Sequence, residues 1–104
     1  MNLNEYQQAA ATTAIYPKSS GVTYNIVGLC GEVGEIAGKY SKCIRDGIIV
    51  DRDDFKKELG DVLWFVAMLA KEFNFSLEEI GLRNLEKLKS RKDRNCLTGD
   101  GDNR

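Results

Sequence analysis

Two pairs of acidic residues have the spacing that would let their side chains act at one point. Glu32 and Glu35 are three residues apart, and so are Glu58 and Asp61. On a helix such residues are surface neighbours, with Cβ atoms about 5–6 Å apart. An isolated E-x-x-E in a charged helix usually lies on the solvated surface. The surroundings of the two pairs therefore decide whether they are surface residues or parts of a functional site.

Those surroundings favour a shared site. Glu58 falls inside the apolar arc of its predicted helix, about 40° from Val62, and a buried carboxylate without a partner is costly. Glu35 falls on the glycine-rich side of its own helix. The stretch between Glu35 and Glu58 is long enough to end one helix, turn and begin an antiparallel one. The two pairs are therefore predicted to face each other.

Four facing carboxylates would make an all-oxygen metal site. The sequence has no histidine, which excludes histidine general bases, Ser-His-Asp triads and histidine-ligated zinc. Oxygen ligands of this kind suit Mg²⁺, with Mn²⁺ as a substitute. Because bound Mg²⁺ usually keeps waters and also binds substrate phosphates, the pattern indicates phosphate chemistry.

Composition excludes several classes of partner. The 104 residues carry 15 basic and 16 acidic side chains, so no basic field exists to bind a nucleic acid backbone. The longest apolar run, 62–70, is far shorter than the ~20 residues that span a bilayer. Residues 1–10 lack the basic start and apolar run of a signal peptide. We therefore expect a cytoplasmic protein with neither nucleic acid nor membrane as partner.

Hydrophobic periodicity predicts an all-α protein, an antiparallel bundle of about four helices. The helices are expected over residues 4–15, 23–43, 51–73 and 76–92, within a domain 1–95 that is followed by a polar tail 96–104. Two capping boxes are expected at helix starts, one formed by Asn4 with Gln7 and one by Ser76 with Glu79.

The faces of the two central helices suggest how they pack. In 23–43 one apolar arc is predicted to face the core: Ile26, Leu29, Cys30, Val33, Ile36, Ala37, Tyr40 and Ile44. The opposite side carries Gly28, Gly31, Gly34 and Gly38, which leaves room either for a close helix or for a ligand. The helix 51–73 is apolar nearly all round, so a subunit interface is expected.

The motifs resemble the MazG-like, all-α nucleoside triphosphate pyrophosphohydrolases. The resemblance is carried by 28–35 (GLCGEVGE) and 58–64 (ELGDVLW), which match an E-x-x-E…E-x-x-D signature. Residues 84–88 (NLEKL) and 99–104 (GDGDNR) are also similar to small single-domain members. The similarity extends over nearly the whole chain.

The resemblance implies hydrolysis of a nucleoside triphosphate, often a deoxynucleotide or a non-standard one, to monophosphate and pyrophosphate. It assigns the metal to Glu32, Glu35, Glu58 and Asp61, and it implies a homodimer or homotetramer. Glu35 is the first candidate for the general base and Glu32 the second. Four further residues are expected to bind the substrate. Asn84, Lys87 and Arg91 would contact the phosphates, and Trp64 would contact the nucleobase.

Several alternatives stay open. Lys87 and Arg91 could form an ordinary solvated basic face, and Trp64 could belong to the core or to an interface. Lys39 and Lys42 could reach phosphate or solvate a helix end. The scaffold could also serve a dUTPase-like or phosphoribosyl-ATP pyrophosphohydrolase, or a helical interaction module without activity.

Overall fold

The computed structural model describes residues 1–104 and contains only helices. In chain order these are α1 (Leu3–Ala11), the 3-10 turn η1 (Lys18–Ser20), α2 (Gly21–Asp46), α3 (Arg52–Glu72) and α4 (Leu77–Asp93). The predicted all-α class is confirmed. No helix is both long enough and apolar enough to cross a membrane.

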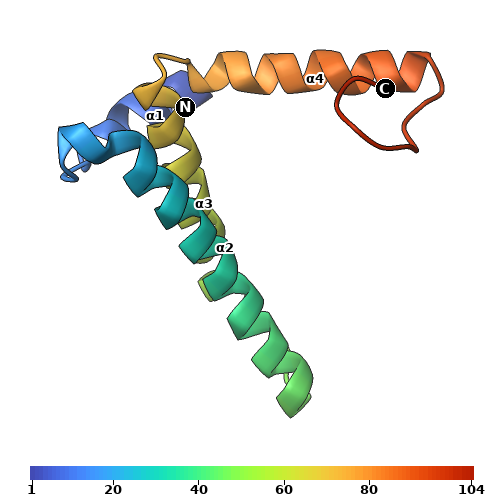
Figure 1. Ribbon diagram of the computed structural model, residues 1–104. Coiled ribbons are helices and arrows are strands. Elements are labelled where there is room, and N and C mark those ends of the chain that lie inside the picture. The colour runs from blue at the N-terminus through green and yellow to red at the C-terminus, as the bar shows by residue number, and fades with distance from the viewer.

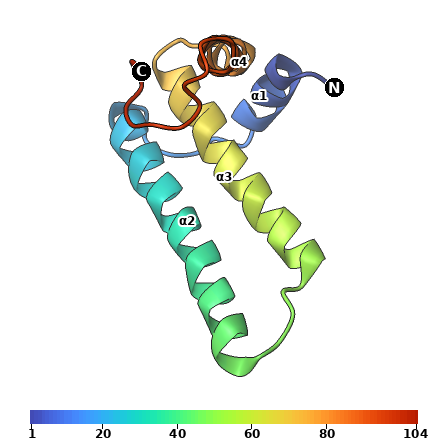
Figure 2. The same cartoon turned by 90° about the vertical axis from the view of Figure 1, so that its right-hand side faces the viewer.

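Helices α2 and α3 form an antiparallel hairpin (Figures 1 and 2). Helix α2 ends at Gly47, whose φ of 63° lies in the left-handed region that glycine adopts at little cost. Helix α3 begins after Asp51, whose side chain accepts hydrogen bonds from the backbone N–H groups of Asp53 and Asp54. These two end signals set the short connection that makes the helices antiparallel.

The capping box predicted for Asn4 and Gln7 is wrong, because the chain enters α1 two residues earlier. Asn2 and Glu5 form the box, with the Glu5 N–H donating to Asn2 Oδ1 over 2.8 Å. The helix also ends at Ala11, short of the predicted 15. The hydroxyls of Thr12 and Thr13 donate to carbonyls three residues back and so compete with the helical bonds.

Asn4 and Gln7 instead cap the start of a different helix. Gln7 Oε1 accepts from the Leu77 N–H over 3.0 Å, and Asn4 Oδ1 accepts from the Glu78 N–H over 3.1 Å. Two orphan N–H groups of α4 are thereby satisfied by side chains of α1. The first and last helices are joined at one corner of the molecule.

The core lies at this corner, where α1, α3 and α4 meet. Its buried side chains are Ala10, Ala67, Met68 and Leu77. From there α4 runs away from the hairpin and does not pack against α2 (Figure 1). Only nine of the 104 residues are buried. The radius of gyration is 16.5 Å, against about 13 Å for a compact chain of this length.

The predicted inner face of α2 is wrong within this chain. Helix α2 meets α3 through Gly28, Glu32 and Lys39. Its apolar arc is largely exposed: Ile26 46%, Val33 51%, Tyr40 52% and Ile44 69%. A Cβ at Gly28 would lie 2.1 Å from Cε1 of Phe65, so the Phe65 ring of α3 uses the space that this glycine leaves. The contact between Gly28 and Phe65 and the ion pair between Lys39 and Glu58 therefore set which face of α2 packs against α3. The apolar arc of α2 stays exposed.

Candidate metal centre

Three of the four predicted acids converge between the two hairpin helices. Glu32 of α2 and both Glu58 and Asp61 of α3 each offer one carboxylate oxygen, and these oxygens lie within 4.8 Å of one another. We call these three residues the acidic cluster. Glu58 is buried, Glu32 is half-buried and Asp61 is exposed, so the cluster opens to solvent on the Asp61 side.

The acidic cluster has the unmet hydrogen-bonding capacity that a cation would satisfy. Glu32 Oε2 and Glu58 Oε2 are buried and have no hydrogen-bond partner. The pKa of Glu32 is raised from its ordinary value, mainly by burial and then by the negative charges of Asp61 and Glu35. Unpartnered buried carboxylate oxygens are costly, and oxygen-only donors fit a hard divalent cation. The residues present therefore fit Mg²⁺.

Lys39 is an important member of the site whose pairing the sequence reasoning missed. Its Nζ lies 2.7 Å from Glu58 Oε1 and 3.0 Å from Asp54 Oδ2. These hydrogen bonds raise the pKa of Lys39. Lys39 engages one oxygen of Glu58 and leaves the other free toward the cluster. The signal was present, since Lys39 is two turns after Glu32 and therefore on the same helix face.

Glu35, the fourth predicted ligand and first candidate base, is exposed and lies outside the acidic cluster. It lies beside Glu32, whose pKa its charge and side chain help to raise. The structure thus places Glu35 beside Glu32, at the rim of the cluster.

Trp64 is held in an aromatic group close to the start of α2. Its indole N–H donates to Thr13 Oγ1 over 2.9 Å, and its ring packs edge-on against Phe65 and Tyr16 at 5.0 and 6.4 Å between centroids. Burial and then the charge of Asp61 raise the pKa of Tyr6. Sequence reasoning did not single out Tyr6.

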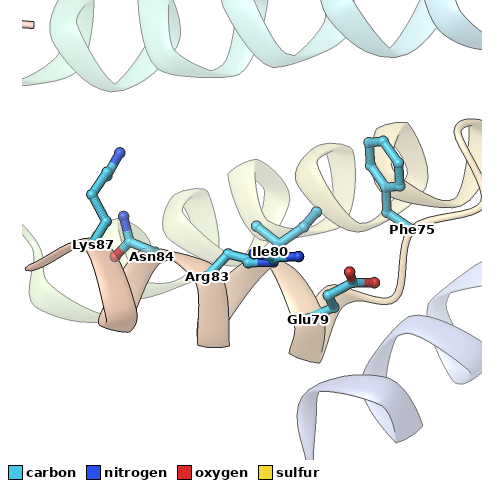
Figure 3. A pocket seen from close by; sticks show the side chains of 6 residues that line it. All are labelled: Phe75, Glu79, Ile80, Arg83, Asn84 and Lys87. Carbon is cyan, nitrogen blue, oxygen red and sulfur yellow. The ribbon is translucent and has the colours of Figure 1, made fainter. Parts of the chain in front are cut away.

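The predicted phosphate contacts lie on α4 and do not contact the acidic cluster of the same chain. Asn84 and Lys87 project from one side of α4 and line a groove of about 410 Å³ (Figure 3). Its other lining residues are Phe75, Glu79, Ile80 and Arg83. Arg91 lies farther along the helix and is buried under the C-terminal residues.

Comparison with known proteins places the chain in a family. The model of the MazG nucleotide pyrophosphohydrolase domain matches residues 21–96, a range that holds both acidic pairs and all of α4. The Gene 37 protein of Mycobacterium phage L5 is 48% identical over 114 residues, covering all of both chains. No solved structure matches. The chain belongs to the MazG nucleotide pyrophosphohydrolase domain family.

Proposed function

We propose that this protein is a Mg²⁺-dependent enzyme that hydrolyses nucleoside triphosphates to nucleoside monophosphates and pyrophosphate. Deoxynucleotides or non-standard nucleotides are the proposed substrates, in the cytoplasmic pool. The observation that carries the proposal is the acidic cluster, with two buried carboxylate oxygens that lack any partner. The family of the chain supports the reaction type.

Glu32, Glu58 and Asp61 would hold the metal, and Glu35 would complete the set from the rim. A bound Mg²⁺, or Mn²⁺ in its place, would neutralise charge on the phosphate oxygens in the transition state. Lys39 fixes the orientation of Glu58 through the 2.7 Å contact with Oε1.

Glu35 is the proposed general base, because it is exposed beside the cluster and can contact a solvent molecule. It would accept a proton while the water oxygen bonds to phosphorus, the bridging P–O bond breaks and pyrophosphate leaves. Glu32 is the second candidate, and its raised pKa makes it a stronger base than an ordinary carboxylate. No histidine competes for the role.

Asn84, Lys87 and Arg91 are the proposed phosphate contacts, and Trp64 is proposed to lie near the nucleobase of the substrate. Since α4 runs away from the hairpin, we propose that a second copy of the chain supplies the three α4 residues within a homodimer or homotetramer. The exposed apolar arc of α2 supports such an assembly, as do Leu82, Leu85 and Leu88 of α4, which are 55%, 63% and 41% exposed.

The test is a hydrolysis panel with Mg²⁺ in which both products are identified. The panel holds the standard ribonucleoside and deoxynucleoside triphosphates, dUTP, several modified nucleotides and phosphoribosyl-ATP. Glu58→Gln and Asp61→Asn should each lower activity at least hundredfold while helical content by circular dichroism is kept. Glu86→Gln, an exposed acid on α4, is the matched control and should change little. More than about a tenth of wild-type activity in both cluster variants would exclude the site assignment.

A further inference from the structure

The C-terminal residues fold back along the far end of α4 and cover its basic side chains (Figure 1). Asp102 Oδ1 lies 3.0 Å from Lys87 Nζ and 3.4 Å from Arg91 Nη2. The same Nη2 donates to the carbonyl oxygens of Gly101 and Asp102 over 3.3 and 3.1 Å. Arg104 donates back to the carbonyls of Gly101 and Leu97, which closes the turn. One carboxylate therefore serves two cations.

The tail satisfies these cations incompletely. The Arg91 side chain is only 7% exposed, and its buried Nε has no hydrogen-bond partner. Its contacts of 3.1–3.4 Å are longer than the roughly 2.7–2.9 Å of strong charge-assisted bonds. A guanidinium has five N–H donors in a fixed fork. A polyphosphate offers more charge and more acceptor oxygens than one carboxylate and so suits this pair better.

We propose that residues 99–104 form a displaceable latch, in which Asp102 occupies the anion site made by Lys87 and Arg91 until substrate phosphate replaces it. The inference rests on the proposed function, because it takes Lys87 and Arg91 as phosphate contacts. Substrate then binds only the open form, so the apparent dissociation constant equals the intrinsic constant divided by the fraction of molecules that are open. Asp102 itself touches neither substrate nor metal.

The other arrangement that the contacts allow is a permanent brace, in which the tail holds Lys87 and Arg91 in place for the phosphate. The latch and the brace predict opposite changes in phosphate affinity. Removing the Asp102 carboxylate strengthens phosphate binding if the tail is a latch and weakens it if the tail is a brace. The low pKa of Asp102, caused mainly by Lys87 and then by Arg91, means that its carboxylate is charged at neutral pH in either arrangement.

The first experiment measures inorganic tripolyphosphate binding by calorimetry, without divalent cations, so that the acidic cluster does not contribute. Asp102→Asn and Asp102→Ala in the full chain should bind about three- to tenfold more tightly than wild type, the range expected from releasing a surface ion pair to Lys87 together with a weak, long contact to Arg91. Asp100→Asn is the matched control. It removes the same charge from the same segment, makes no ion pair in the structure, and should change binding less than twofold.

The second experiment uses the wild-type chain and does not depend on any variant folding. Cys96 is half-buried, with its Sγ 3.6 Å from the carbonyl oxygen of Arg104. Displacing the tail should expose this thiol. Saturating tripolyphosphate is expected to speed alkylation of Cys96 several-fold, measured peptide by peptide by mass spectrometry. The exposed Cys30 of α2 is the internal control and should keep its rate.

Three results would overturn the latch: no tripolyphosphate binding by any form, binding by the Asp102 variants that is no tighter than wild type, or a Cys96 rate that ligand leaves unchanged or slows. Failure of the proposed reaction is seen separately. If no nucleotide is hydrolysed but Asp102→Asn still tightens tripolyphosphate binding, the latch stands and the reaction does not. If hydrolysis is robust and binding is unchanged by Asp102→Asn, only the latch is lost.

Discussion

The carboxyl group of Glu32 lies among other acids, and its pKa is raised. It is half-buried, one of its oxygens has no partner, and three other carboxylates raise its pKa further after burial has done so. An acid whose pKa is raised in the folded protein binds its proton more tightly there than in the unfolded chain. Stability is therefore lost as the pH rises from the ordinary value of 4.5 through the raised folded value.

Glu32→Gln should consequently stabilise the metal-free protein at neutral and mildly alkaline pH. The difference in melting temperature between the variant and wild type should grow as the pH rises through that window, because only the wild type must ionise Glu32. Added Mg²⁺ should stabilise wild type more than the variant. Thermal unfolding in EDTA and in Mg²⁺, across a pH series, measures both effects. A variant less stable than wild type at alkaline pH without metal would contradict the explanation.

Lys87 and Lys89 separate a phosphate contact from a solvated basic face. Lys87 lines the groove of Figure 3, whereas Lys89 pairs with Asp93 over 2.7 Å on the exposed surface. Lys87→Ala should lower kcat/KM ten- to hundredfold, for a lost charge-assisted contact of roughly 1.5–3 kcal/mol. Lys89→Ala should change kcat/KM by less than about twofold. Equal, small effects would move the phosphate contact elsewhere, with Lys42 next, because Lys39 is paired with Glu58.

At the scale of elements, the four glycines of α2 from Gly28 to Gly38 divide into two kinds. Gly28 is required for the contact between α2 and α3, because Phe65 fills the space beside it. Gly31, Gly34 and Gly38 have no atom within 4 Å of an added Cβ. The sequence left close packing and ligand room as alternatives. The structure assigns close packing to the first glycine and leaves open space at the other three.

Gly28→Ala should destabilise the protein by about 1–3 kcal/mol, because the Phe65 ring must move. Gly31→Ala is the matched control on the same helix and should stabilise by about 0.5–1 kcal/mol, since alanine restricts the unfolded chain and favours the helix. Chemical denaturation followed by circular dichroism measures both free energies of unfolding. An equal loss from both substitutions would show that Gly31 is also covered in the assembled protein.

At the scale of the whole molecule, the single chain is open and much of its apolar surface is exposed. The chain has nine buried residues and a radius of gyration of 16.5 Å, and large apolar side chains of all four α-helices are exposed. Small domains bury the smallest fraction of their surface and depend most on added contacts. A second copy is the occupant that the proposed function also requires.

Sedimentation should therefore detect a dimer or a larger species at micromolar concentration. Ile44→Asp, placed at the exposed end of the apolar arc, should dissociate it, because a carboxylate would be buried without a partner. Ile15→Asp is the control, since Ile15 is 95% exposed in the connection between α1 and η1. A well-folded monomer for the wild-type chain would exclude the proposed assembly.

The local features of this protein could be predicted from its sequence. Periodicity gave the helices, Ser76 was correctly expected to cap α4, and the i, i+3 spacing placed each acidic pair on one side of its helix. These features depend on neighbours within one or two turns, so the residues that decide them are adjacent in the sequence.

Features that depend on contacts between distant segments of the chain were visible only in the folded structure. Which face of α2 meets α3 was settled by Phe65 against Gly28 and by Lys39 against Glu58, partners that periodicity cannot pair. Asn4 has good capping chemistry, but only the folded chain brings it to α4. From the sequence alone Arg91 could be a surface cation, but in the folded chain the C-terminal residues cover it. In each case the side chain had several acceptable partners, and the closing of long chain segments selected one.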